Sequence, residues 1–248
     1  MSEPHPDMPK QWIKGMEPTM NDKGFMFAIL DEFANEFIQL SGASEDEVLE
    51  LGCAYGVATI KALEAGGRVT ACDMDERHLE VLLSRVPDEC RDRLTLKAGT
   101  LPDIDLPENH FGAVLCSRVI HFLRGDDIDA TVRNVFRWLK PGGRFFLVAD
   151  TPYGIWRNFI PTWDANIEKG ERWPGLMERL LDFLPFTPSR EDAGPEFMNL
   201  MSPDLLERTC KEAGFEVERA VWVRRDDFGS KGRMDGRENC GLAAIKPV

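Results

Sequence analysis

Small residues alternate through one short turn of the chain, between an apolar run and a helix-forming segment. The turn reads Glu50-x-Gly52-x-Ala54-x-Gly56 and directly follows the apolar residues 48–49. Glycine adopts positive φ angles at little cost and lets a ligand approach the backbone closely. The helix expected behind the turn adds free N–H groups and a positive dipole end. We therefore expect a ligand-binding turn, which tolerates alanine at 54 if the φ angle there is negative.

A second acidic residue, Asp73, ends the strand expected at 68–72 and lies 21 residues after Gly52. A carboxylate at the end of such a strand can accept hydrogen bonds from both hydroxyls of an adenosine ribose. The alternative is that Asp73 only caps the helix that follows it. Dinucleotide-binding folds share this acidic residue, but their G-x-G-x-x-G pattern fails at Ala54 and Val57. The turn and the carboxylate together predict a ligand that contains a nucleoside.

Apolar runs of strand length alternate with amphipathic runs of helical period from residue 48 to residue 149. This alternation predicts a parallel sheet with helices on both faces, where ligands bind beyond the carboxyl ends of the strands. After the first strand, the expected strands are 68–72, 94–99, 111–116 and 144–149, and the expected helices are 59–63, 76–85 and 128–139. In the helix 76–85, we expect Leu79, Leu82 and Leu83 to face inward.

The N-terminal residues 1–20 are expected to form an irregular arm anchored by Trp12 and Ile13. Apolar side chains then recur every fourth residue from Phe25 to Phe37, which is typical of an amphipathic helix. This helix is expected to end at Ser41-Gly42 and to pack on the core. Residues 1–43 together are a candidate lid over the ligand cleft.

Four motifs occur in a fixed order along the chain. They are ELGCAYG (50–56), ACDMD (71–75), LPENHFGAVLCSRVIHFL (106–123) and LKPGGRFFLVAD (139–150). In this order they resemble class I methyltransferases that use S-adenosylmethionine (SAM), of the ubiquinone and menaquinone biosynthesis type. The resemblance covers about residues 47–150 and resumes near residue 202.

The resemblance implies an α/β fold with a Rossmann-like, doubly wound sheet of seven strands, the last of them antiparallel. Strand 6 with its preceding helix would lie within 212–223, and strand 7 within 240–248. The expected organisation is an N-terminal arm and helix (1–43), a SAM-binding core (44–150), an inserted helical cap (151–200) and the C-terminal part of the core (201–248).

The resemblance also implies a set of SAM contacts. The methionine moiety would lie over the turn at 50–56, Asp73 would hold the ribose, and Met74 would pack on the adenine. Thr100 stands at the adenine edge, where many relatives carry Asp. The complete implied set is Glu50, Gly52, Cys53, Ala54, Gly56, Asp73, Met74, Gly99, Thr100, Ser117 and Arg118. S-adenosylhomocysteine (SAH) would be the product.

The segment 151–200 breaks the strand–helix alternation and contains six of the 16 prolines. Its eight aromatic residues are Tyr153, Trp156, Phe159, Trp163, Trp173, Phe183, Phe186 and Phe197. A solvated linker would not be so apolar. We interpret the segment as a cap, helical over 176–184, that either completes the core or walls the acceptor site together with Met198, Met201 and Trp12.

Methyl transfer by in-line displacement requires alignment and a dry site more than acid–base chemistry. A base is needed only if the acceptor arrives protonated. His121, just beyond the fourth strand, and Tyr153, just beyond the fifth, are the candidates, with simple packing as the alternative for each. No His or carboxylate cluster has metal-ligand spacing, so we expect no metal.

The formal net charge of −13 argues against nucleic acid or an anionic membrane as the main partner. Without an apolar run of about 18 residues or a secretory signal, we expect no membrane insertion and a cytoplasmic location. Of the six cysteines, Cys72 and Cys116 are expected to be reduced core residues, and the basic stretch 224–237 is expected to be a solvated face.

The predicted function is therefore methylation of a small, partly apolar acceptor. Several alternatives stay open on the sequence. They are a nucleotide-dependent oxidoreductase, a non-catalytic SAM-binding or interaction module, and a methyltransferase acting on protein or RNA. The sequence also leaves open whether the chain forms a homo-oligomer.

Overall fold

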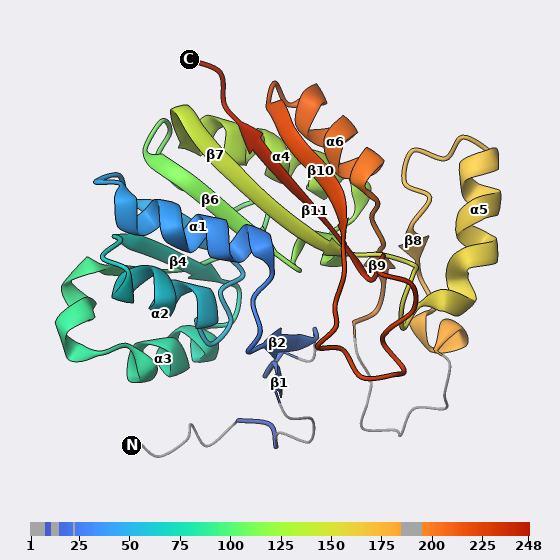
Figure 1. Ribbon diagram of the computed structural model, residues 1–248, viewed down its shortest axis with the longest axis horizontal. Helices are drawn as coiled ribbons and strands as arrows, with labels where there is room; N and C mark the ends of the chain where they lie inside the picture. Colours follow the sequence, from blue (N-terminus) through green and yellow to red (C-terminus); the bar gives the residue numbers. More distant parts are fainter. Residues whose placement is uncertain (1–7, 11–14, 22, 185–194) are drawn as a thin grey trace.

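A computed structural model describes residues 8–10, 15–21, 23–184 and 195–248 (Figure 1). Its centre is one sheet of seven strands. In sheet order they are β10 (Glu216–Val223), β11 (Asn239–Ile245), β7 (Leu139–Asp150), β6 (Phe111–Ser117), β3 (Val48–Leu51), β4 (Val69–Asp73) and β5 (Leu94–Ala98). Strand β11 runs antiparallel to both of its neighbours, and the remaining pairs are parallel. The predicted α/β fold with an antiparallel last strand is confirmed.

Helices cover both faces of this sheet (Figure 1). One face carries α1 (Glu32–Ala43), α2 (Val57–Glu64) and α3 (Glu76–Arg85), and the other carries α4 (Gly125–Trp138) and α6 (Pro203–Glu212). Successive strand residues point to opposite faces. Val48 accordingly belongs to the same buried cluster as Phe33 of α1, whereas its neighbour Leu49 belongs to the cluster that contains Ile128 of α4.

The helix α3 has the predicted bounds, but the prediction that all three of its leucines face inward is wrong for one of them. Leu79 and Leu82 are buried, whereas Leu83 is 43% exposed. The buried face of α3 is completed instead by His78 and Val81. A leucine next to a buried leucine on a helix lies about 100° around the axis, and here that rotation carries Leu83 to solvent.

The N-terminal region differs from both predictions made for it. The expected helix begins at Glu32, and residues 25–27 form strand β2 (Phe25–Phe27), paired antiparallel with β1 (Met16–Pro18). Asp31 sets the helix start, because its side chain accepts the Ala34 N–H at 3.0 Å. The apolar repeat at every fourth residue, which predicted one helix, therefore spans two elements, a strand of the hairpin and the helix α1. The predicted anchors Trp12 and Ile13 lie outside the described residues.

The cap also folds differently from the prediction. Residues 176–184 contain strand β8 (Leu176–Met177) and the 3₁₀ turn η4 (Leu180–Phe183), and the α-helix of the cap is α5 (Ile160–Glu168). Strand β8 pairs with β9 (Met198–Asn199). Gly175 allows this pairing, since a Cβ there would lie 1.8 Å from the Leu200 carbonyl oxygen.

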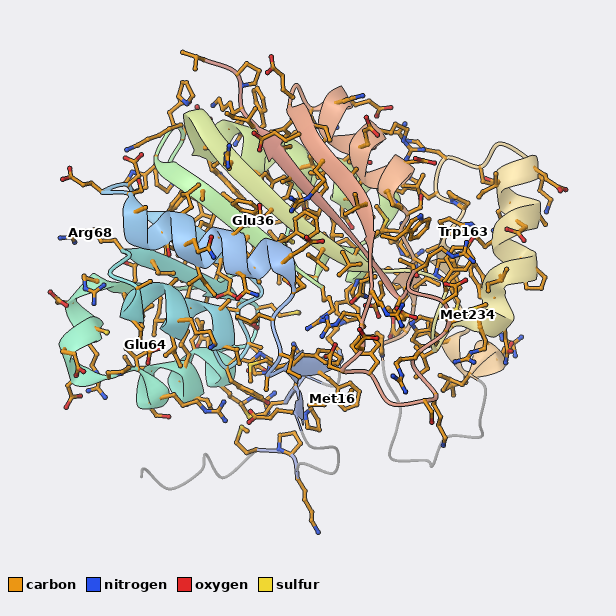
Figure 2. All side chains as sticks on the ribbon, in the orientation of Figure 1. Met16, Glu36, Glu64, Arg68, Trp163 and Met234 are labelled. Atoms are coloured by element: carbon orange, nitrogen blue, oxygen red, sulfur yellow. The ribbon has the colours of Figure 1, made fainter. Side chains whose placement is uncertain are left out.

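Several cap side chains extend the hydrophobic core of the α4 face. The buried ones are Phe159, Trp163, Met177, Leu180, Met198 and Leu200, and Met201 directly after the cap joins them. Figure 2 marks Trp163 on α5, on the far side of the molecule from Glu64 at the end of α2. The predicted cap aromatic Phe186 lies outside the described residues.

The basic stretch 224–237 is not uniformly solvated. Arg225 is buried, and its Nη2 donates to Asp227 Oδ2 at 2.6 Å. Its guanidinium also lies 4.5 Å from the Phe228 ring centre. The six cysteines are all free and buried, which agrees with the prediction made for Cys72 and Cys116.

Candidate functional site

A cavity of about 280 Å³ opens at the carboxyl ends of β3, β4 and β6. One side consists of the turn after β3, Asp73 with Met74, and the residues 99–101. Another side, which we call the N-terminal wall, consists of residues 19, 21, 23–27 and 30. The third side consists of residues 117–119, 122 and 123. The cavity therefore lies where ligands of open α/β sheets bind.

Nearly all of the predicted SAM contacts line this cavity. They are Glu50, Gly52, Cys53, Ala54, Asp73, Met74, Gly99, Thr100, Ser117 and Arg118. Gly56 does not line it, because it serves as the left-handed N-cap of α2, with φ 82°. A Cβ at Gly56 would lie 2.1 Å from Leu82 Cδ1, so α2 and α3 require glycine there to pack closely.

The turn after β3 has positive φ at each of its small residues. The φ angles are 69° at Gly52, 45° at Ala54 and 82° at Gly56. The expectation of a negative φ at Ala54 is therefore wrong. The Ala54 N–H donates to Asp73 Oδ2 at 2.9 Å, and this bond holds the alanine in the left-handed region. At Gly52 a Cβ would lie 2.3 Å from Val119 Cγ2, which leaves no space for a side chain.

Asp73 is buried at the end of β4 and is held by three donors. Besides Ala54, the Asp75 N–H donates to Oδ1 at 3.0 Å, and His78 Nδ1 lies 2.9 Å from the same oxygen. His78 Nε2 accepts the Met20 N–H at 3.1 Å. Because Nε2 is an acceptor, the imidazole proton lies on Nδ1 and is donated to Asp73. The carboxylate orientation is thus fixed from the turn, from α3 and from the N-terminal segment.

Glu50 lies beneath the turn and is also buried. Its Oε2 accepts a hydrogen bond from the Thr59 hydroxyl of α2. Burial raises the pKa of Glu50 to about 7, so the carboxyl is close to half ionised at neutral pH. A cationic ligand nearby would favour the carboxylate form.

The two predicted base candidates lie outside the lining of this cavity. His121 is buried in the 3₁₀ turn η2 (Ile120–Phe122), and its Nδ1 accepts the Asp150 N–H at 3.0 Å. Burial lowers the pKa of His121, so the ring resists protonation. The ring centre of Tyr153 lies 5.4 Å from that of Trp222. The guanidinium carbon of Arg237 lies 3.5 Å from the same Tyr153 ring centre. The geometry gives both residues packing contacts, and their catalytic roles stay predictions.

The described residues of the cap do not line the cavity either, so its role as an acceptor wall also stays a prediction. The N-terminal wall lines the cavity instead, and it includes Phe25, Met26 and Phe27. Sequence reasoning missed these residues and His78. The aromatic alternation of residues 25–27 after Gly24 is the signal of a short strand that could have located the wall.

The sequence comparisons match this geometry. Residues 48–143 match the model of a methyltransferase domain family. The cypemycin N-terminal methyltransferase of a Streptomyces species is 36% identical over 197 residues, which cover 79% of this chain and 74% of that protein. The chain belongs to the class I SAM-dependent methyltransferases.

Further relatives agree with this membership. The demethylmenaquinone methyltransferase of Symbiobacterium thermophilum is 29% identical over 189 residues, 68% of each chain. The crystal structure of the glycopeptide N-methyltransferase MtfA with SAM has a TM-score of 0.58 at 24% identity, and covers 86% of this chain and 92% of that one. A Methanosarcina mazei methyltransferase reaches 0.62 at 17% identity, covering 83% and 94%. The structural matches support the fold.

This methyltransferase uses SAM as its methyl donor, and the cavity has the chemistry that SAM requires. The fixed, buried carboxylate of Asp73 is a hydrogen-bond acceptor suited to a ribose diol. The cavity also contains a second carboxyl, Glu50, whose ionised form a sulfonium or ammonium would favour. Within the described ranges, no His, Cys, Asp and Glu side chains form a group of three that could hold a metal ion. None of the described helices combines the length and apolarity needed to cross a bilayer.

Proposed function

We propose that this enzyme transfers the methyl group of SAM to a small, partly apolar acceptor by in-line displacement. The observation that carries this proposal is that the cavity lining combines carboxyls with aromatic rings. The carboxyls are those of Glu50 in β3 and Asp73 in β4. The aromatic rings are those of Phe25, Phe27 and Phe122. A polar cofactor and an apolar acceptor would each meet a matching surface.

The cofactor contacts that we propose are those of the predicted set apart from Gly56 and Arg118. Asp73 would accept from the ribose, Met74 would cover the adenine, and Thr100 would bind at the adenine edge. Met74 is 51% exposed, so its thioether is available to pack on a planar ring. The turn after β3 and Ser117 would lie along the methionine moiety.

The reaction then needs alignment and exclusion of water from this chain. SAM supplies a methyl group that its sulfonium already activates. The N-terminal wall contributes apolar surface that excludes water, and the rigid strand ends of β3 and β6 would align the acceptor with the methyl group. Support for an apolar acceptor also comes from the relative named demethylmenaquinone methyltransferase.

A peptide amine is the second candidate acceptor. It is favoured by the 36% identical relative, which is named an N-terminal methyltransferase. The net charge of −13 is compatible with a cationic peptide and opposes RNA. A non-catalytic SAM-binding module is the outcome if no acceptor is found.

The test is transfer of label from isotopically labelled SAM into a cell extract that is then separated by size. We expect label in the low-mass fraction with the wild-type chain and none above background with Asp73→Ala. Asp88→Asn is the matched control, because Asp88 carries an 87% exposed side chain away from the cavity. Label in the high-mass fraction would contradict the small acceptor and favour protein or RNA.

A further inference from the structure

Arg118 is a charged residue of the cavity without a charged partner among the described residues. It directly follows β6 with a φ angle of 56° and lines the cavity. Its Nη1 nitrogen is buried and has no hydrogen-bond acceptor within the described part of the chain. The guanidinium carbon lies 3.8 Å from the centre of the Phe27 ring, so the side chain is stacked in place. A buried donor left without an acceptor is costly, which suggests that a ligand supplies one.

The position of Arg118 in the sheet separates it from the ribose-binding side. Asp73 ends β4 and Arg118 follows β6, and β3 lies between these two strands. Two strand spacings correspond to about 10 Å. Phe27, on which Arg118 stacks, also stacks with Phe228 of the loop after β10, at 5.1 Å between ring centres. Arg118 therefore lies away from the proposed ribose position, next to the aromatic ring of Phe27.

The other arginines of this region are already paired. Arg225, 5.2 Å from the same Phe27 ring, is bound to Asp227. Arg124, six residues after Arg118, pairs with Glu178 at 3.3 Å and does not line the cavity. Of these three arginines, only Arg118 both lines the cavity and has a buried donor without an acceptor among the described residues.

The charge of Arg118 then restricts the acceptor. SAM brings a positive sulfonium into the same cavity, and a second unpaired cation nearby would oppose its binding. An acceptor with an oxyanion would neutralise the guanidinium and satisfy its planar donors, which match a carboxylate in two-point geometry. The aromatic rings of Phe25, Phe27 and Phe122 would contact the apolar remainder of such an acceptor.

We propose that Arg118 is the anion-recognising residue of the acceptor site, and that the acceptor joins a carboxylate or comparable oxyanion to an apolar body. This assignment rests on the proposed function, since it places the anion on the acceptor and not on the cofactor. The guanidinium would hold the anion at the aromatic side of the cavity and thereby set the distance of the nucleophile from the methyl group.

The experiment titrates the full chain, saturated with SAH, with 2-naphthoate and octanoate. Their neutral counterparts 2-naphthamide and octanamide test for apolar contacts alone. The same titrations are made with Arg118→Gln, Arg118→Lys and the matched control Arg124→Gln, after thermal unfolding has confirmed that each variant is folded. The affinity for SAH alone is measured for every variant.

We expect the wild-type complex to bind the carboxylates about tenfold more tightly than the amides, as a charge-assisted hydrogen bond allows. Arg118→Gln should lose this preference, Arg118→Lys should keep part of it, and Arg124→Gln should keep it fully. Equal binding of acids and amides by the wild type would overturn the proposal. A tenfold loss of SAH affinity in Arg118→Gln with the acid preference intact would also overturn it, because the guanidinium would then hold the cofactor carboxylate.

These titrations measure binding affinities in the presence of SAH, which has no methyl group to transfer. An absence of methyl transfer therefore counts against the proposed function, whereas a loss of acid preference counts for or against the role of Arg118.

Discussion

His78 and Asp73 share a hydrogen bond of 2.9 Å between the imidazole Nδ1 and the carboxylate Oδ1. The second imidazole nitrogen accepts the Met20 N–H at 3.1 Å. The N-terminal segment that contains Met20 is also held by Tyr55, whose hydroxyl donates to the Pro18 carbonyl at 2.8 Å. One buried ring thus connects the proposed ribose carboxylate to the segment that carries the N-terminal wall.

His78→Phe should loosen this connection while keeping a ring of similar volume. Asp73 would lose one donor and the Met20 N–H would lose its acceptor, at a cost of about 1–3 kcal/mol for a buried unpaired group. We expect SAM affinity to fall by about threefold to tenfold. We also expect trypsin to cleave after Lys23 more quickly, since Lys23 belongs to the loosened wall.

The control for this variant is His110→Phe, since His110 is a half-exposed histidine that bonds Glu47 outside the cavity. Unchanged SAM affinity and unchanged cleavage in His78→Phe would show that the wall is held without the imidazole.

Asp73→Asn should weaken SAM binding by about tenfold or more, because a neutral amide accepts more weakly than a carboxylate. The amide also has only one acceptor oxygen for the three donors at this site. Calorimetric titration with SAM measures the effect, and Asp88→Asn serves as the surface control. Wild-type affinity in Asp73→Asn would remove the carboxylate from the proposed ribose contact.

Ala54→Gly should leave stability unchanged or raise it by up to about 1.5 kcal/mol. Glycine relieves the left-handed alanine, by about 1–2 kcal/mol, but adds about 0.4–1 kcal/mol of unfolded-state entropy. Ala54→Val, by contrast, should reduce SAM affinity sharply, because a β-branched residue strongly disfavours positive φ. Urea unfolding and SAM titration of the pair provide the measurement. Similar behaviour of both variants would contradict the left-handed conformation at residue 54.

Glu50 should make stability depend on pH between its ordinary pKa of 4.5 and its folded value of about 7. In this window the folded chain binds more protons at Glu50 than the unfolded chain, so its contribution is full below pH 4.5 and is lost as pH rises through 7. Relative to Glu50→Gln, the wild type should lose about 2–3 kcal/mol between pH 5 and pH 8.

Urea unfolding at the two pH values measures this difference. Glu64→Gln, at an exposed carboxylate that ends α2, controls for the loss of one negative charge. A wild type and a Glu50→Gln variant that respond equally to pH would contradict the raised pKa.

His121→Phe should mainly lower stability, by about 1–3 kcal/mol, since the Asp150 N–H would lose its acceptor. The pH dependence of kcat should keep its wild-type shape from pH 6 to 9. The check combines thermal unfolding with methyl-transfer rates once an acceptor is known. Wild-type stability together with a lost titration in the rate profile would instead establish His121 as the base.

The sequence alone determined the sheet and most of the cofactor side of the cavity. Buried parallel strands are recognisable in the sequence as local apolar runs. The number of residues between Glu50 and Asp73 corresponds to one strand–helix–strand unit. The residues at their carboxyl ends must meet, because parallel strands end on the same edge of the sheet. The turn after β3 and Asp73 were therefore predicted from local patterns, whereas Gly99-Thr100 and Ser117-Arg118 were implied by the family resemblance, and all of these positions line the cavity.

Only the tertiary structure decided which distant segments complete the cavity. Phe27 of β2 stacks on Arg118 after β6, although about 90 residues separate them in the sequence. The apolar period that suggested a helix could not reveal this, because aromatic side chains suit both a short strand and a helix face. His121 likewise follows β6 in the sequence, but its ring is turned onto the Asp150 backbone by packing and not toward the cavity. Such orientations depend on contacts between elements, which the local sequence does not contain.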